Sequence, residues 1–277
     1  MNKNNEMKLL ALFGLLMLVF LPSTGAVMVS GVVFDPEVDA GDHVRHEITV
    51  SLKDTENATD LTAEICDWNQ TLDGGNIIDL EESVETPYSA KSFLKITPSS
   101  IHLEPGRSER ILVEGDIPSD AAPGGRYAIV SLKSAPVAAP GAEDEGQKSQ
   151  VSVVIAYNVL IMIKVRGDIN QSAEITDLSI EEPVSARQQN VTLTLKNTGN
   201  FHYKPDIEVA IKDKEGNILA SQTVSRDSSI IPPFSNQIRI SLNPESELEP
   251  GSYALESIVS LKDGTVIARK EMEIEVE

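Results

Sequence analysis

Cysteine is nearly absent from this sequence of 277 residues, which contains only Cys66. A single thiol excludes an internal disulfide, so the fold must be stabilised by hydrophobic cores of adequate size. Helical periodicity is missing too, because apolar residues after residue 26 do not recur at helical spacing over a useful length. This second absence argues against a helical architecture.

Catalytic motifs are missing as well. The sequence has no Gly-x-Ser-x-Gly elbow, no His-Glu-x-x-His pair and no glycine loop of the kind that binds phosphate. A lone cysteine is not a nucleophile unless a base lies nearby, so Cys66 is interpreted as a small core residue. We therefore predict that the protein is not an enzyme and has no catalytic or cofactor-binding residues.

Positive charge is scarce. The chain has 23 Lys and Arg against 43 Asp and Glu, a formal net charge of −20. Such a surface repels phosphate backbones, so we predict no nucleic-acid partner. His43 and His46 stand three residues apart at the start of a predicted strand, which places them on opposite faces, and no EF-hand loop is present. We therefore predict no metal site.

The first 26 residues have the pattern of a secretory signal. Lys3 and Lys8 precede an apolar run over residues 9–21, and small residues follow up to Ala26. The run is shorter than the roughly 20 residues of a membrane span. We predict a signal peptide over 1–26 and an extracellular or cell-surface location, with an uncleaved signal as N-terminal membrane anchor as the alternative.

The rest of the chain has the pattern of an all-β protein. Alternating, β-branched runs bounded by Gly, Pro, Asn and Asp predict two immunoglobulin-like β-sandwich domains in tandem, over 27–167 and 168–277, with Gly167 and Asp168 as the hinge. Strands are predicted at 44–52, 61–65, 93–97, 110–114, 126–133 and 151–165 in the first domain. In the second they are predicted at 173–180, 190–196, 206–212, 218–224, 237–242, 253–261 and 266–276.

The most unusual segment is the predicted strand at 151–165, which follows a loop rich in Ala, Pro, Gly and acidic residues. Every odd position in it is apolar, namely Val151, Val153, Ile155, Tyr157, Val159, Ile161, Ile163 and Val165. One face therefore suits a core, whereas the other is only half polar. Two hypotheses remain open: the strand pairs with a partner protein by strand addition, or it is a core strand shared with the interface to the second domain.

Single residues suggest further sites. Trp68, the only tryptophan, would stack on a sugar if its ring were exposed, although a buried tryptophan is also usual in a sandwich core. Tyr127 and Tyr253 each follow a turn and precede a strand, which predicts that they hydrogen-bond back to the main chain as tyrosine corners. Four Asn-x-Ser/Thr sequons predict possible N-glycosylation in an exported chain, at Asn57, Asn69, Asn170 and Asn190.

Part of the chain resembles known families. The segment FLKITPSSIHLEPG at 93–106, followed by Ile111-Leu112-Val113, Ile117-Pro118 and Gly124-Gly125-Arg126-Tyr127, resembles the N-terminal domain of WxL-interacting proteins of bacterial cell surfaces. It is also similar to the first domain of periplasmic pilus chaperones. The second domain, with its turns at 197–200 and 250–253, resembles adhesion-type (CARDB-like) immunoglobulin-like domains of surface proteins.

These resemblances imply a partner at the cell envelope. WxL-interacting proteins attach to wall polymer and hold partner surface proteins, so we expect a non-catalytic binding or scaffold protein that contacts a cell-wall or surface-layer polymer or another exported protein. The alternative, implied by the chaperones, is an assembly factor that donates the edge of strand 151–165 to exported subunits.

Overall fold

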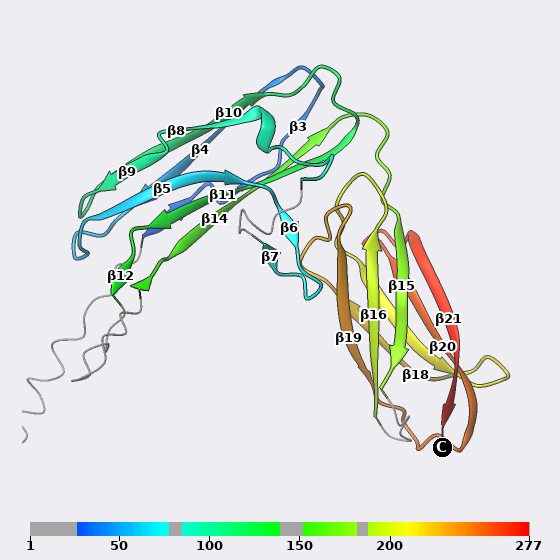
Figure 1. The fold of residues 1–277 in the computed structure, drawn as a ribbon. Coiled ribbons are helices and arrows are strands. Elements are labelled where there is room, and N and C mark those ends of the chain that lie inside the picture. Colours follow the sequence, from blue (N-terminus) through cyan, green and yellow to red (C-terminus); the bar gives the residue numbers. More distant parts are fainter. Residues whose placement is uncertain (1–26, 78–84, 139–151, 182–187, 277) are drawn as a thin grey trace, which may run out of the picture.

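The computed structural model describes residues 27–77, 85–138, 152–181 and 188–276. In these ranges the chain forms strands, apart from turns and one 3-10 helix at Lys91–Phe93. The predicted signal peptide lies outside the described residues. Two β-sandwiches follow one another and meet at an angle (Figure 1), so the predicted fold class is confirmed. No helix in the described ranges is both long and apolar enough to span a bilayer.

The first sandwich contains two main sheets, and both are built from strands distant in sequence. One sheet has the order β1 (Met28–Ser30), β4 (His43–Ser51), β10 (Ser108–Asp116) and β8 (Leu94–Thr97). The other has the order β2 (Val33–Phe34), β14 (Ala156–Val165), β11 (Gly124–Ser134), β5 (Thr59–Cys66) and β9 (Ser100–Leu103), with β3 (Glu37–Val38) also pairing with β14. Two small hairpins are β6 (Asn69–Gln70) with β7 (Asn76–Ile77), and β12 (Val137–Ala138) with β13 (Ser152–Val153).

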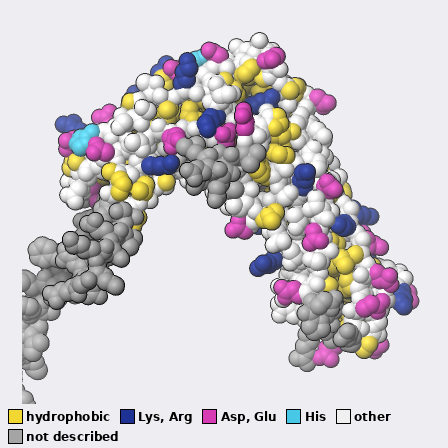
Figure 2. Space-filling model, viewed as in Figure 1, with side chains coloured by type: hydrophobic (Ala, Val, Ile, Leu, Met, Phe, Trp, Pro, Cys, Tyr) yellow, Lys and Arg dark blue, Asp and Glu magenta, His cyan; other side chains and the backbone are white. Residues whose placement is uncertain are grey.

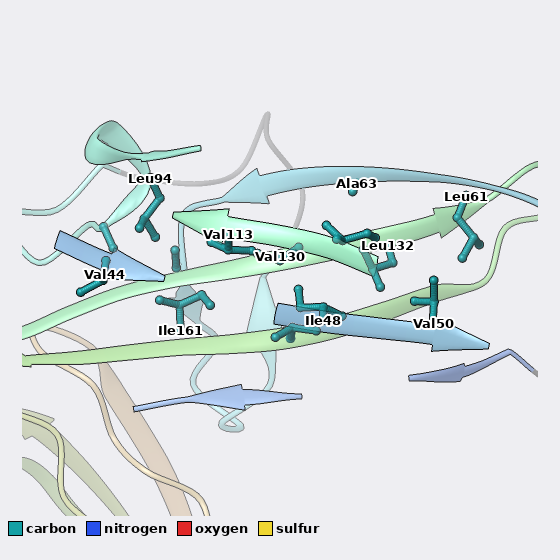
Figure 3. Packing of buried hydrophobic residues seen from close by; sticks show 14 of the residues in the cluster. Val44, Ile48, Val50, Leu61, Ala63, Leu94, Val113, Val130, Leu132 and Ile161 are labelled. Atoms are coloured by element: carbon teal, nitrogen blue, oxygen red, sulfur yellow. The ribbon is translucent and has the colours of Figure 1, made fainter. Parts of the chain in front are cut away.

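The core of the first sandwich is formed by alternate residues of facing strands. Ile48 of β4, Val130 of β11 and Ile161 of β14 are all fully buried in the same cluster (Figure 3). Because strand side chains alternate between faces, the period-two pattern of each strand sends one set of apolar residues into this space. Full burial of such a side chain contributes about 1.5 to 3 kcal/mol.

The second sandwich confirms all seven strands predicted for it. One sheet has the order β15 (Ala173–Ile180), β16 (Gln189–Asn197) and β19 (Ser235–Leu242). The other has the order β18 (Ile218–Ser225), β17 (Asp206–Lys212), β20 (Gly251–Ser260) and β21 (Val266–Val276). Gly216 and Gly264, each with φ of 88°, lie in the predicted turns that join β17 to β18 and β20 to β21. A separate core cluster begins at Ile175, whereas the first ends at Val165. The exact domain boundary at 167/168 stays a prediction.

A third apolar cluster lies where the two sandwiches meet, and we call this region the joint. It contains buried Trp68, Tyr127, Ile129 and Ile231, with Tyr88, Leu160, Met162 and Phe234 packed against them. The hairpin of β6 and β7 lies between the sandwiches (Figure 1), where the Gln70 side chain donates to Ser229 O at 2.9 Å and accepts from Ile231 N at 3.0 Å. Packed apolar and polar contacts therefore connect the two sandwiches beyond the single chain crossing at Gly167.

Charged side chains cover both sandwiches. Figure 2 shows acidic groups scattered over the visible face of each sandwich rather than gathered in one patch. This distribution agrees with the reading of the net charge of −20 as a solvated surface.

Candidate functional site

The segment predicted as one strand at 151–165 is divided in the structure. Val151 lies outside the described residues, β13 covers Ser152–Val153, and β14 covers Ala156–Val165. Of the odd positions, Val159, Ile161, Ile163 and Val165 are buried in the first core and Tyr157 is partly buried. Val153 and Ile155 are instead 45% and 43% exposed. The alternation therefore reflects a core strand only in its second half.

The two halves also differ in their neighbours. On one side, β11 pairs with β14 from Ala156 to Val165, and β12 pairs with β13. On the other side, β2 pairs with Leu160 and Ile161, and β3 pairs with Lys164 and Val165. Among the described residues, no strand pairs with 152–159 on this second side. We call this side of residues 152–159 the open edge.

A change of sheet near Gly31 leaves this edge open. The N-terminal segment pairs with β4 as β1 and then crosses to β14 as β2. Gly31 has φ of 75°, and a Cβ there would lie 2.6 Å from Glu47 O, so the crossing requires glycine. His46 Nε2 lies 2.7 Å from Gly31 O and fixes the crossing. The N-terminal segment pairs with β14 only from Val33 onwards, so residues 152–159 have no pairing with it.

The backbone groups at the open edge belong to even-numbered residues. Leu160 N donates to Val32 O at 2.9 Å and Lys164 N to Pro36 O at 2.9 Å, so even positions of β14 face the β2 side. Ile155 O, at an odd position, accepts instead from Ser134 N on β11. The N–H and C=O groups of Ala156 and Asn158 therefore point towards the open edge.

Exposed apolar side chains flank the open edge, and we call them the arm patch. Val153, Val154 and Ile155 lie on its own strand segment, and Val32 and Val33 lie where β2 begins, with exposures between 43% and 49%. The hairpin of β12 and β13 is at the end of the first sandwich that lies away from the second one (Figure 1). Edge strands of stable proteins are usually protected by charge, by proline or by a covering segment. An apolar open edge is therefore typical of a site for another chain.

The other end of β14 carries charge that is already paired. Lys164 Nζ lies 3.1 Å from Glu37 Oε2, and Arg166 Nη1 lies 3.0 Å from Asp39 Oδ2. The hydrogen bond from Lys164 is the main reason that the pKa of Glu37 is below its ordinary value, and the charges of Lys164 and Arg166 lower it further. These cations are therefore paired with carboxylates in and beside the chain's own β3.

Trp68 has no open face. It is 6% exposed, its ring lies edge-on to Tyr127 with centroids 6.1 Å apart, and its Nε1 donates to Asn76 at 2.8 Å. The ring therefore lacks the exposure that stacking on a sugar requires, because it packs within the joint. Cys66 is also buried, and burial raises the pKa of its thiol.

The sequons differ in accessibility. Asn57 and Asn170 are exposed. Asn69 is 2% exposed and belongs to β6, so its amide is inaccessible in the folded chain. The Asn190 side chain is held between Glu181 and Ser241. Of the four predicted sites, Asn57 and Asn170 present the amide that glycosylation requires, and their modification stays a prediction.

The histidines occupy separate environments. His43 pairs with Asp116 at 2.8 Å, whereas His46, on the other face of β4, stacks on Phe34. His102 Nδ1 lies 2.7 Å from Asp60, and this hydrogen bond raises the pKa of the imidazole. In the ranges that the structure describes, no three His, Cys, Asp or Glu side chains are grouped to hold a metal ion.

The two tyrosines predicted as corners have different roles. The hydroxyl of Tyr253 donates to Glu249 O at 2.7 Å, so this corner is confirmed. The prediction for Tyr127 is wrong, because its hydroxyl accepts from His202 N, 2.9 Å away in the second sandwich. Tyr127 faces away from the first core, together with Ile129, and so reaches the joint instead of its own turn.

Comparison with solved structures finds chaperones of bacterial fimbriae. The class 5 fimbriae chaperone CfaA is 12% identical, with 91% of this chain and 99% of that chain covered and a TM-score of 0.43. The Escherichia coli chaperone DraB is 11% identical, with 90% and 98% covered and a TM-score of 0.38. A chain from a Salmonella enterica structure of the SafA pilin in complex with the SafB chaperone is 11% identical, with 90% and 96% covered and a TM-score of 0.36.

These likenesses concern the arrangement of strands. No family model matches the sequence, and no curated protein matches it. The assignment of two β-sandwiches rests on the strand orders and the two core clusters of this chain.

Proposed function

We propose that this chain is an exported, non-catalytic binding protein whose first sandwich binds an extended segment of another exported protein at the open edge. The observation that carries the proposal is the division of β14 into a half that is enclosed by neighbours and a half that is not. Of the two functions implied by the sequence, the geometry favours the assembly factor over the polymer-binding scaffold.

Backbone pairing would select a partner segment in an extended conformation. Ala156 and Asn158 offer two N–H donors and two C=O acceptors along one line, which matches the backbone of a strand. Asn158 also has a buried side-chain Oδ1 without a hydrogen-bond partner among the described residues. Each hydrogen bond formed to an added strand contributes about 0.5 to 1.5 kcal/mol net.

The arm patch would add apolar burial to this backbone pairing. Val153 ends β13, Val154 and Ile155 lie between β13 and β14, and all three are about half exposed, so a partner gains most if it covers all of them. Completing the burial of these half-exposed side chains contributes about 1 kcal/mol each. A folded subunit with an open apolar groove matches this geometry better than a soluble sugar polymer does.

The identity of the envelope partner rests on the sequence alone. The resemblance to WxL-interacting proteins and to CARDB-like domains favours a wall-associated partner, and the export of the chain rests on the pattern of residues 1–26. Both stay predictions.

The experiment compares two pairs of charge substitutions, both at exposed apolar residues. The double variant Val154→Lys and Ile155→Lys changes the arm patch, and the double variant Ile218→Lys and Val266→Lys changes residues 56% exposed in the second sandwich. Each protein is purified from the native host, and circular dichroism checks that both retain the β spectrum. We expect a one-to-one complex with an exported protein for the wild type and the control variant, and its loss in the arm variant.

Amide hydrogen exchange then tests where the partner binds. The amides of Ala156 and Asn158 become protected when the purified partner is added, because they enter a new ladder. Equal binding by the two double variants, or binding without protection at these two amides, contradicts the proposal. Recovery of both variants by purified wall material alone would favour the scaffold function.

A further inference from the structure

The joint contains a partly buried histidine that contacts groups from both sandwiches. His202 follows the turn at 197–200, and its backbone N–H donates to the Tyr127 hydroxyl at 2.9 Å. Its Nδ1 lies 3.2 Å from the same hydroxyl, and its carbonyl accepts from Gln171 at 2.8 Å. The imidazole packs against the rings of Phe201 and Tyr127, with centroids 4.2 and 5.7 Å away.

The arrangement of these hydrogen bonds favours a neutral imidazole. The tyrosine oxygen accepts from the backbone N–H of His202, so its own proton is left to donate, and Nδ1 is the acceptor within reach. Burial raises the pKa of Tyr127, so this hydroxyl keeps its proton. Protonated His202 carries a hydrogen on Nδ1 and cannot accept. The buried hydroxyl proton then loses its partner, at a cost comparable to an unmade hydrogen bond.

The charges around His202 also disfavour a cation. Lys204 follows it in sequence, and Lys164, which is paired with Glu37, lies over the Phe201 ring at 5.8 Å. On the first sandwich, Arg126 directly precedes Tyr127 in sequence and is 8% exposed, and its guanidinium donates to the carbonyls of Ala122 and Gly125 alone among the described residues. Asp35 is the carboxylate that favours the charged form of His202.

We propose that His202 makes the joint sensitive to pH: its neutral side chain holds the two sandwiches together, and its protonation loosens them. This inference is independent of what binds at the open edge, because it concerns contacts between Tyr127 and the second sandwich. In an exported protein it would couple the relative position of the sandwiches to the acidity of the surroundings.

The pH range follows from the titration of the imidazole. The pKa of His202 is lowered from an ordinary 6.5 to about 4, mainly by burial and also by Lys204, whereas Asp35 acts in the opposite direction. We call the joint docked when the two sandwiches are in contact and undocked when they are apart. Because the pKa of His202 is lower in the docked joint, docking is strongest above pH 6.5 and weakens as the pH falls from 6.5 towards 4. At pH 5 the ratio of undocked to docked joint should be about 30-fold higher than at pH 7.5.

Amide hydrogen exchange of the full chain measures this ratio. Gly125 N donates to Asn200 O at 2.7 Å and Ile231 N to Gln70 Oε1 at 3.0 Å, so both amides report on the joint. We expect their protection, corrected for intrinsic exchange, to fall about 30-fold between pH 7.5 and 5. The amide of Leu193, in the second core, should not change in protection.

Two glutamine variants separate His202 from the many carboxylates that also titrate. His202→Gln keeps an acceptor for the tyrosine proton but cannot be protonated, and His102→Gln removes an exposed histidine on β9. The pH effect should vanish in the first variant and persist in the second. If His202→Gln does not fold, an NMR titration of the His202 ring in the wild type decides. Unchanged protection in the wild type, the same fall in His202→Gln, or a ring pKa near 6.5 overturns the proposal.

Discussion

The two halves of the segment 152–165 show how one alternating pattern has two structural outcomes. Around Ile161 and Ile163 the strand lies between β11 and the segments β2 and β3, and its outward side chains Leu160 and Met162 pack in the joint. Around Val153 and Ile155 the same alternation continues, but one side has no neighbour and the side chains are exposed. Apolar alternation therefore indicates that one face of a strand is suited to burial. Whether the same chain buries that face depends on which segments lie beside the strand.

The largest expected effect tests burial along this strand. Ile161→Ala should lower the free energy of unfolding by about 3 kcal/mol because it leaves a cavity in a fully buried site. Ile155→Ala, six residues earlier on the same parity, should lower it by less than about 0.5 kcal/mol because the side chain is 43% exposed. Urea denaturation of both variants measures the difference. Equal losses would mean that the first half of the segment is also enclosed in the isolated protein.

A smaller effect tests the joint against a hydrogen bond inside one sandwich. Tyr127→Phe leaves the His202 N–H without its acceptor and should cost about 1 to 3 kcal/mol in docking. Tyr253→Phe removes the bond to exposed Glu249 O and should cost about 1 kcal/mol or less. Urea unfolding, combined with exchange of the Gly125 amide, separates loss of docking from loss of fold. If Tyr253→Phe were the more damaging change, the joint would contribute little to stability.

The smallest effect concerns the ion pair at the enclosed end of β14. Because the pKa of Glu37 is lowered chiefly by its hydrogen bond to Lys164, the pair stabilises the fold above the unfolded pKa of Glu37. This stability is lost as the pH falls through the lower, folded pKa. Lys164→Met should therefore make the urea midpoint depend less on pH between about 5 and 3. An unchanged pH dependence would show that Arg166 alone suffices for Glu37.

The strands could be predicted from the sequence because period-two burial is a local signal. All seven strands of the second sandwich were found in this way. In the first sandwich the short strands β1, β2, β3, β6, β7 and β9 have too few residues to show alternation, and the sequence does not predict them. Of these, β2 and β3 enclose one half of β14 and leave the other open, so the extent of the open edge could not be predicted.

The joint was also missed, since it unites side chains far apart in sequence. Tyr127 was assigned to a corner because it follows a turn, and Trp68 was considered for sugar stacking because it is the only tryptophan. A signal was present in β11, where residues on both faces of the strand between Ala128 and Leu132 are apolar or small. A strand with two such faces must be covered on both, and the second sandwich provides the cover for Tyr127 and Ile129.

The crossing of the N-terminal segment at Gly31 has a mechanical consequence. A single short stretch of chain is hydrogen-bonded to β4 on one side of the core and to β14 on the other. It acts as a tie between the layers, so they cannot shear past each other without breaking one of these ladders. The edge at Ala156 and Asn158 is thus held in place before another strand pairs with it, so an incoming chain bears the entropy of ordering only itself.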